Sequence, residues 1–282
     1  MEFEFSKMHG IGNDYVYINC YKETIDKPEN LAEVVSDRHF GIGSDGLVLI
    51  QPSEVADCKM CMYNADGTVG AMCGNGIRCV GKYVYDRGLV SKDVIKVETL
   101  SGTKKLKLSI HNNQVSSVTV NMGKPSLKAK DIPVKTNKSK MIGDLLIVKK
   151  RIYRITCVSM GNPHTVIFVK DVNKIKLNHI GKAIENHRIF PNRTNVEFVK
   201  VIDDTNIEVR VWERGSGETL ACGTGACACV VAAVAAGYCK KSTLIKVKLL
   251  GGYLYIKYLA NGDVLMNGPA AFVYTGKYKL KN

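Results

Sequence analysis

Residues 221–237 read ACGTGACACVVAAVAAG, a cysteine and a Gly-Thr-Gly turn followed by an unbroken apolar run. Gly237 stands where a glycine commonly ends a helix. A helix that is apolar on every face must be buried on every face. This one is too short for a membrane span, which needs about 20 apolar residues. The pattern therefore predicts a central core helix whose N-terminal turn presents Cys222.

The first half of the chain alternates short apolar segments with turns, which is typical of strands. A helix is predicted over Leu31–Phe40, with Asn30 as its N-cap and Gly41 closing it. A second helix is predicted to follow residues 72–76 (MCGNG) and to end at Arg87, before Gly88. The predicted strands are Phe3–Phe5, Tyr15–Ile18, Leu47–Ile50, Cys58–Tyr63, Val94–Val97, Lys104–Ser109 and Val115–Asn121.

The second half repeats this order. Gly12-Asn13 recurs 149 positions later as Gly161-Asn162, and the CGNG sequence at 73–76 recurs as CGTG at 222–225. Several matches in one order at nearly one offset indicate a duplicated domain. We therefore expect an α/β (α+β) fold of two pseudo-symmetric, duplicated domains, each a mostly antiparallel curled sheet around one central helix. The expected domains are 1–122, completed by a C-terminal strand at 271–282, and 123–270.

Composition narrows the classes of function. The net charge of +14 could suggest nucleic-acid binding, but the lysines are scattered and lack the interleaved aromatic residues that stack on bases. We therefore expect a solvated basic surface, with neither a nucleic acid nor a membrane as partner. The N-terminus lacks the pattern of a signal peptide. The ten cysteines are consequently expected to be reduced thiols in a cytoplasmic protein.

One glycine pattern and one cysteine pattern resemble binding motifs, but their surroundings do not fit. Residues 41–46 match the dinucleotide pattern GxGxxG, but a helix precedes them and a strand follows, the reverse of what pyrophosphate binding requires. Cys58 and Cys61 have the spacing of a zinc or redox pair, yet no second pair completes a four-ligand set. Both thiols fit a strand core better. We expect no metal site.

Cys73 and Cys222 differ from the other cysteines because each opens a predicted helix. The helix dipole and free backbone N–H groups there favour a thiolate and are expected to lower the thiol pKa. Each is followed by Gly-x-Gly, which lets backbone N–H groups approach an anion such as a carboxylate. A symmetric pair suggests proton transfer at one carbon from opposite faces, with inversion of the centre. The alternative is two core cysteines that happen to begin helices.

Glu213-Arg214 and His164 are further charged residues beside turns. On the residues alone, a surface ion pair and an internally bonded loop histidine explain these residues as well as a role in the site does.

Five segments together resemble the diaminopimelate epimerase family, and the resemblance runs from the first predicted strand to the last. They are residues 7–14 (KMHGIGND), 64–67 (NADG), 72–79 (MCGNGIRC), 158–164 (VSMGNPH) and 212–225 (WERGSGETLACGTG). The resemblance implies a cofactor-independent isomerase that interconverts LL- and meso-2,6-diaminoheptanedioate in lysine and peptidoglycan precursor biosynthesis, with the active site between two similar domains.

By matched position, the resemblance implies that Cys73 and Cys222 are the catalytic residues. It implies that His164 and Glu213 contact substrate or tune the thiol pKa values, and that Tyr274 lies at a homodimer contact. The implied substrate-binding residues are Asn13, Asn64, Gly74, Asn75, Asn162, Asn195, Glu213, Arg214, Gly223 and Thr224.

One departure from the family concerns Gly46, because some members carry a substrate-binding glutamine there. The nearest rival function is that of a proline-racemase-like enzyme, whose substrate would leave Asn64, Asn195 and Arg214 without a task. A basic nucleic-acid-binding protein is the rival from another class.

Overall fold

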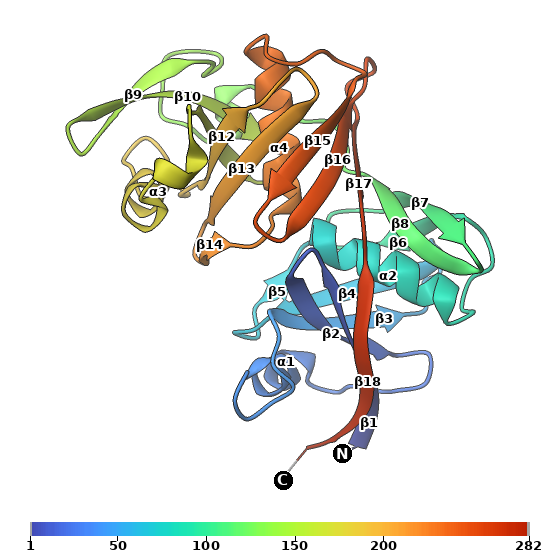
Figure 1. Cartoon of the computed structure of the whole chain (residues 1–282). Coiled ribbons are helices and arrows are strands. Elements are labelled where there is room, and N and C mark those ends of the chain that lie inside the picture. Colours follow the sequence, from blue (N-terminus) through green and yellow to red (C-terminus); the bar gives the residue numbers. More distant parts are fainter. Residues whose placement is uncertain (1, 281–282) are drawn as a thin grey trace. The chain divides into compact units, whose positions relative to one another are not determined.

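The computed structural model describes residues 2–280, which divide into two compact units (Figure 1). The chain up to Val120 and the segment from Asn267 onward form the first unit, and Asn121–Met266 form the second. The last strand, β18 (Ala271–Lys279), pairs antiparallel with the first, β1 (Glu2–Gly10). Residues 281–282 of the predicted C-terminal strand lie outside the described residues.

In the first unit the strands follow the order β18-β1-β2-β3-β4-β6-β7-β8. Helix α2 (Gly74–Asp86) packs against β1 and β2 and also against β6 and β7. These strand pairs are separated in the order, so the sheet curls around the helix. The remaining elements are β2 (Asn13–Asn19), α1 (Pro28–Ser36), β3 (Gly46–Gln51), β4 (Cys58–Asn64), β5 (Val69–Gly70), β6 (Val94–Glu98), β7 (Lys104–His111) and β8 (Gln114–Asn121).

The second unit has the strand order β9-β10-β11-β12-β13-β15-β16. Its central helix α4 (Gly223–Ala235) packs against β10, β11, β12, β13 and β16. The elements are η1 (Ala129–Asp131), β9 (Asp144–Val148), β10 (Arg151–Ser159), β11 (Pro163–Phe168), η2 (Val172–Lys174), α3 (Leu177–Glu185), β12 (Asn195–Val201), β13 (Asn206–Glu213), β14 (Gly217–Thr219), β15 (Leu244–Leu249) and β16 (Gly252–Tyr258). β17 (Val264–Gly268) joins the two units in sequence.

The two units repeat one pattern of strand pairing. From β1 to β7, successive partners pair antiparallel, parallel, antiparallel, parallel and antiparallel. From β10 to β16 the same alternation returns. The register also keeps the offset of 149, because Val16 pairs with Leu47 and Thr165 pairs with Val196. The predicted α+β fold of duplicated curled sheets is confirmed.

Helix α4 confirms the interpretation of the apolar run. Its residues from Ala226 to Ala233 are at most 1 % exposed, and Gly237 follows with a φ of 80°. The prediction for α1 was wrong by several residues at each end. The helix starts at Pro28, whose fixed φ suits a first turn. It ends at Ser36 because the Asp37 carboxylate accepts hydrogen bonds from the His39 and Phe40 backbone N–H groups.

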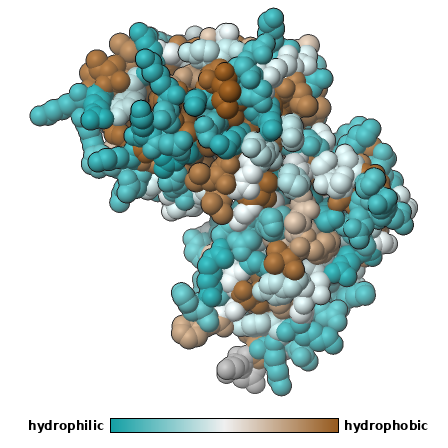
Figure 2. Space-filling model, viewed as in Figure 1, coloured by the Kyte–Doolittle hydropathy of each residue, from teal (hydrophilic) through white to brown (hydrophobic). Residues whose placement is uncertain are grey.

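The face drawn in Figure 2 is mainly hydrophilic, with apolar residues in scattered groups. Apolar side chains instead fill a core layer in each unit, between α1 and strands β1–β3 in the first and between α3 and strands β9–β12 in the second. The central helices α2 and α4 are buried as well. Within residues 2–280, none of the helices combines the length and the apolar character that crossing a membrane requires.

Candidate active site

Cys73 is the N-cap of α2 in the first unit. Its Sγ accepts a hydrogen bond from the Gly76 backbone N–H at 3.3 Å and lies 3.2 Å from Asn13 Oδ1. Asn13 Nδ2 donates to Asp45 Oδ2 at 2.7 Å, so the carboxylate fixes which end of the amide faces the thiol. Tyr15 also hydrogen-bonds to Cys73, and burial raises the pKa of its phenol well above the usual range. The structure thus brings together Cys73 and Asn13, two of the predicted site residues.

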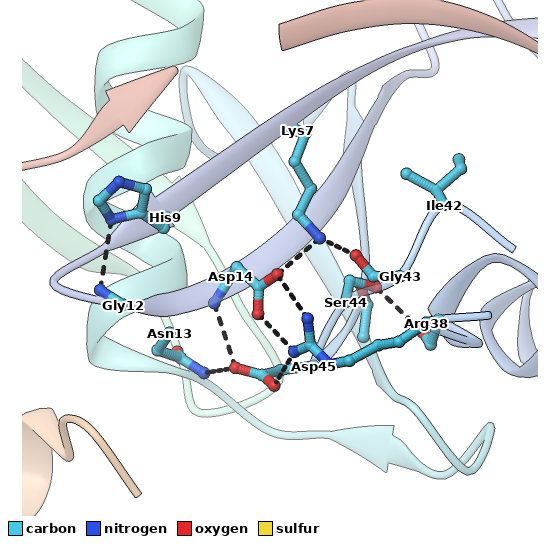
Figure 3. Close-up of polar contacts among 12 residues, drawn as sticks. Lys7, His9, Gly12, Asn13, Asp14, Arg38, Ile42, Gly43, Ser44 and Asp45 are labelled. Carbon is cyan, nitrogen blue, oxygen red and sulfur yellow. Dashed lines mark hydrogen bonds and ion pairs between the residues drawn. The ribbon is translucent and has the colours of Figure 1, made fainter. Parts of the chain in front are cut away.

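A charged network holds Asn13 in place (Figure 3). Arg38 bridges Asp14 and Asp45, in each case at 2.8 Å, and the buried Lys7 lies 2.6 Å from Asp14. Burial alone would raise the pKa of Asp14, but hydrogen bonds from Arg38 and Lys7 outweigh it and leave that pKa lowered. The pKa of Asp45 is raised by burial and by the neighbouring Asp14 carboxylate.

The first turn of α2 is anchored by a fully buried arginine. Arg78 Nη1 donates to the Gly74 carbonyl and to Asn75 Oδ1, both at 3.0 Å, and Nε donates to the Pro269 carbonyl at 3.1 Å. A Cβ at Gly10 would lie 2.8 Å from Arg78 Nη2, which explains the glycine there. The predicted substrate-binding positions Gly74 and Asn75 therefore stand on a fixed turn.

Two positions of the first unit have other local contacts. Asn64, at the end of β4, donates from Nδ2 to Thr68 Oγ1 at 2.9 Å. A Cβ at Gly46 would meet the Tyr63 carbonyl oxygen at 2.1 Å, so no larger side chain fits the strand as it stands.

Cys222 is the N-cap of α4 and repeats the geometry of Cys73. Its φ and ψ are −122° and 114°, against −118° and 121° for Cys73, and its Sγ accepts from the Gly225 backbone N–H at 3.4 Å. The Sγ lies 3.5 Å from Thr224 Oγ1, which receives a hydrogen bond from Asn162 Nδ2 at 3.3 Å. The two halves therefore place their thiols by one local arrangement.

Cys222 also hydrogen-bonds to Glu213, whose Oε1 accepts from Thr219 Oγ1 at 2.5 Å. Burial raises the pKa of Cys222 well above the usual range, and the carboxylates of Glu213 and Glu197 raise it further. The expectation of a lowered pKa is wrong for Cys222 in the substrate-free protein. Loss of water and two nearby negative charges outweigh the helix N-terminus.

His164 is completely buried between two oxygen atoms. Nδ1 lies 2.6 Å from Glu197 Oε1, and Nε2 lies 3.0 Å from Asn162 Oδ1. Because Asn162 in turn reaches Thr224, the predicted residues His164, Asn162, Thr224 and Cys222 form one connected group. The alternative of a loop histidine is wrong about the location, because His164 lies in strand β11, but right that the ring has internal partners. A role in tuning the thiol stays a prediction.

The Asn195 side chain is hydrogen-bonded to the backbone of Arg214. Asn195 Oδ1 accepts from the Arg214 N–H at 2.8 Å, and Nδ2 donates to the Pro163 carbonyl at 2.9 Å. The Arg214 side chain donates to the Asn192 carbonyl at 2.9 Å. Asn195 thereby ties the turn after β13 to β11. Direct contact of either residue with substrate stays a prediction.

Sequence reasoning missed Asp45, Tyr15 and Glu197. The last had a readable signal, because Val196-Glu197-Phe198 places a charge in the middle of an apolar strand. Burial of such a charge is costly unless it is paired. Within residues 2–280 we find no group of three or more His, Cys, Asp or Glu residues placed to hold a metal ion.

Comparison with solved structures defines the class of fold. A Bacillus anthracis phenazine biosynthesis protein of the PhzF family superposes with a TM-score of 0.72 at 16 % identity, covering 99 % of this chain and 100 % of that one. A probable proline racemase from Agrobacterium radiobacter gives a TM-score of 0.73 at 14 % identity, covering 99 % and 93 %. The fold is thus the one that these two proteins share. In this chain, a cysteine stands at the start of each central helix.

The family follows from the sequence comparisons. The profile of diaminopimelate epimerase matches residues 5–128 and 156–273. The diaminopimelate epimerase of Acetivibrio thermocellus is 53 % identical over 277 residues, covering 98 % of both chains. That of Methanococcus maripaludis is 51 % identical over 276 residues, covering 97 % of this chain and 99 % of the relative. The chain belongs to the diaminopimelate epimerase family and is an isomerase.

Proposed function

We propose that this protein interconverts LL- and meso-2,6-diaminoheptanedioate, with Cys73 and Cys222 exchanging protons with one α-carbon. The observation that carries the proposal is the matched placement of two thiols, each the N-cap of the central helix in its own unit. Each Sγ accepts from the backbone N–H three residues on, at 3.3 Å and 3.4 Å. Membership of the diaminopimelate epimerase family supports the substrate.

The chemistry needs one base and one acid at the same carbon. In one direction a thiolate removes the α-hydrogen and the other thiol delivers its proton to the opposite face. The configuration inverts, and the two sulfur atoms exchange protonation states. The raised pKa of Cys222 favours the thiol form in the substrate-free protein, which suits the proton donor. Reversal of the reaction exchanges the roles.

The α-carboxylate would bind at the helix starts, where backbone N–H groups and the helix dipole favour an anion. Gly74, Asn75, Gly223 and Thr224 occupy those first turns. The same donors would stabilise the negative charge that develops when the α-hydrogen leaves. We assign the remaining contacts, including the distal amino-acid end of the substrate, to Asn13, Asn64, Asn162, Asn195, Glu213 and Arg214. Gly46 offers no side chain for this task.

The proposed reaction requires no cofactor, and we propose the cytoplasm as its compartment because the mechanism depends on reduced thiols. We also propose a homodimer that uses β18. Tyr274 and Val273 on this strand are 46 % and 54 % exposed, and Tyr274 lies edge-on to the Phe5 ring at a centroid distance of 5.8 Å. Sedimentation of the wild-type protein and of Tyr274→Ala would test the dimer. A wild-type monomer at micromolar concentration contradicts it.

The deciding experiment incubates LL-diaminopimelate with the protein in deuterated water. We expect meso product that carries deuterium at the inverted α-carbon, and the absence of both product and label would refute the proposal. L-Proline in a parallel reaction tests the proline-racemase alternative, for which the likeness of fold is the sole support.

Single substitutions test the two thiols. Cys73→Ala and Cys222→Ala should each abolish epimerisation, because either change removes one of the two proton carriers. Cys79→Ala and Cys229→Ala are matched controls, since these cysteines are buried in the same two helices away from the caps. Near-normal turnover in either cap variant would rule out the two-thiol scheme.

A further inference from the structure

A hydrogen-bonded chain leads from the middle of β12 to Cys222, fully buried at the Glu197–His164 end and partly buried from Asn162 onward. It begins at Glu197, which is 0 % exposed, and passes through His164 and Asn162 to Thr224. The Thr224 hydroxyl lies 3.5 Å from the Cys222 Sγ. The residues come from β12, from β11 and the turn just before it, and from the first turn of α4, so the chain crosses from the sheet to the central helix. Glu197 is the one charged group at its far end.

The positions of the acceptors determine where the protons lie. His164 faces a carboxylate oxygen at Nδ1 and an amide oxygen at Nε2, with Asn162 Nδ2 turned to Thr224. Only the doubly protonated imidazolium donates from both ring nitrogens. A neutral ring has one N–H. If that N–H is on Nε2, the Asn162 orientation is kept only when the Glu197 carboxyl is protonated and donates to Nδ1. If it is on Nδ1, Asn162 would have to turn its amide and donate to the bare Nε2. That rotation removes the donor from Thr224.

The Glu197 carboxylate is an unusual group to bury without a cation. Its Oε2 is buried and has no hydrogen-bond partner among the described residues. The carboxylate also lies against α4, since a Cβ at Gly225 would be 2.8 Å from Oε1. An ionised carboxylate in such a place is costly unless an opposite charge is bonded to it. An imidazolium at 2.6 Å supplies that charge.

At the matched positions of the first unit, the described residues do not repeat this arrangement. The positions 149 residues earlier hold Val48 in place of Glu197 and Tyr15 in place of His164. There Asn13 gives its Nδ2 to Asp45 and turns its oxygen toward Cys73. Asn162 has the opposite polarity, with its oxygen toward His164 and its nitrogen toward the start of α4. The duplicated asparagines thus present an acceptor at one thiol and a donor at the other.

We propose that Glu197 is a positioning residue that keeps His164 doubly protonated and thereby fixes the Asn162 amide with its N–H directed at Thr224 beside Cys222. Apart from its charge, which adds to the raised pKa of Cys222, Glu197 acts in this role through its contact with His164 and, beyond it, Asn162. The proposal rests on the proposed function only for its effect on turnover. The protonation of His164 is a property of the protein alone.

The first test is nitrogen-15 NMR of the histidine rings in the wild-type protein at neutral pH, with the His164 signals identified by their loss in His164→Gln. We expect the chemical shifts of an imidazolium, with both nitrogens protonated. A neutral ring would overturn the proposal, and this measurement needs no variant of Glu197 to fold. It remains decisive even if the protein fails to epimerise diaminopimelate, an outcome that would refute the proposed function alone.

The second test is kinetic. Glu197→Gln keeps the shape and an acceptor for Nδ1 but removes the charge, so His164 should become neutral. We expect kcat/KM to fall about 10–100-fold, the usual range for residues that orient a functional group. Glu208→Gln is the matched control, because Glu208 lies on the neighbouring strand β13 and pairs with Lys248 at the surface. It should retain wild-type activity.

The third test asks whether the effect passes through Asn162. If it does, adding Glu197→Gln to Asn162→Ala should cost much less than the same change in the wild type, because coupled residues are not additive. Normal activity of Glu197→Gln, or full additivity with Asn162→Ala, would contradict the proposal. So would an imidazolium signal that persists unchanged in Glu197→Gln.

Discussion

The two CGxG turns allow a matched test of the packing around each thiol. Gly76 and Gly225 are both the third residue of their helix, and neither has a positive φ. Alanine therefore suits both backbones and should favour the helix by up to about 1 kcal/mol. The surroundings of the two positions differ, so the same substitution should cost stability at Gly225 and have little effect at Gly76.

At Gly225 the new methyl group would lie 2.8 Å from Glu197 Oε1 and 3.3 Å from Cys222 Sγ. The carboxylate must retreat by roughly 0.6 Å to reach ordinary contact. It cannot do so without stretching its 2.6 Å bond to His164. A hydrogen bond between charged groups is worth about 1.5–3 kcal/mol. After the gain in helix propensity, Gly225→Ala should destabilise the second unit by about 1–2 kcal/mol.

At Gly76 the nearest atom to the new methyl group is the Met60 Cε, 3.1 Å away at the end of a flexible side chain. A small rotation of that side chain relieves the contact, so Gly76→Ala should leave stability within about 1 kcal/mol of the wild type. Scanning calorimetry would compare both variants with the wild type. For a unit of this size, the loss at Gly225 corresponds to a Tm lower by roughly 3–8 °C. A Gly225→Ala protein at least as stable as Gly76→Ala would refute the reasoning.

Three further predictions concern charged groups. Burial, and after it the Glu213 carboxylate, raise the pKa of Cys222. Alkylation of this thiol in the protein without substrate should therefore begin only above the pH at which ordinary thiols react, and Glu213→Gln should shift the onset to lower pH. Peptide mapping across a pH series checks this, and an unchanged onset contradicts it. The pKa of Asp14 is lowered on folding, so its ionised form stabilises the protein at pH values above the ordinary pKa of 3.8, and this stabilisation is lost as the pH falls through the folded-state pKa. In urea unfolding, Asp14→Asn should therefore be less stable than the wild type at pH 7. The difference in stability should close below pH 3.8. Lys82 pairs with Asp86 at 2.7 Å in a nearly buried site, so Lys82→Met should cost about 3–5 kcal/mol in the same assay, and a loss below 1 kcal/mol would show the pair to be dispensable.

The sequence repeat at an offset of 149 residues predicted most of the fold. Hydrophobic periodicity, helix-ending glycines and the recurrence of CGNG as CGTG are local or order-based signals, and these are properties a single chain displays without its tertiary contacts. They predicted both central helices and the duplicated curled sheets. They misplaced α1, because the helix ends where the Asp37 carboxylate accepts hydrogen bonds from the His39 and Phe40 backbone N–H groups, before Gly41 is reached.

The sequence by itself also determined the two cap cysteines, since a cysteine followed by Gly-x-Gly at a helix start is a local pattern. Only the tertiary structure decided what surrounds each sulfur. Asp45 reaches Asn13 from 32 positions away, and Glu197 reaches His164 from 33. Strand pairing brings these partners together, and no local rule states which strands become neighbours. The pKa of Cys222 was decided in the same way, because burial and distant carboxylates outweighed the helix end that the sequence revealed.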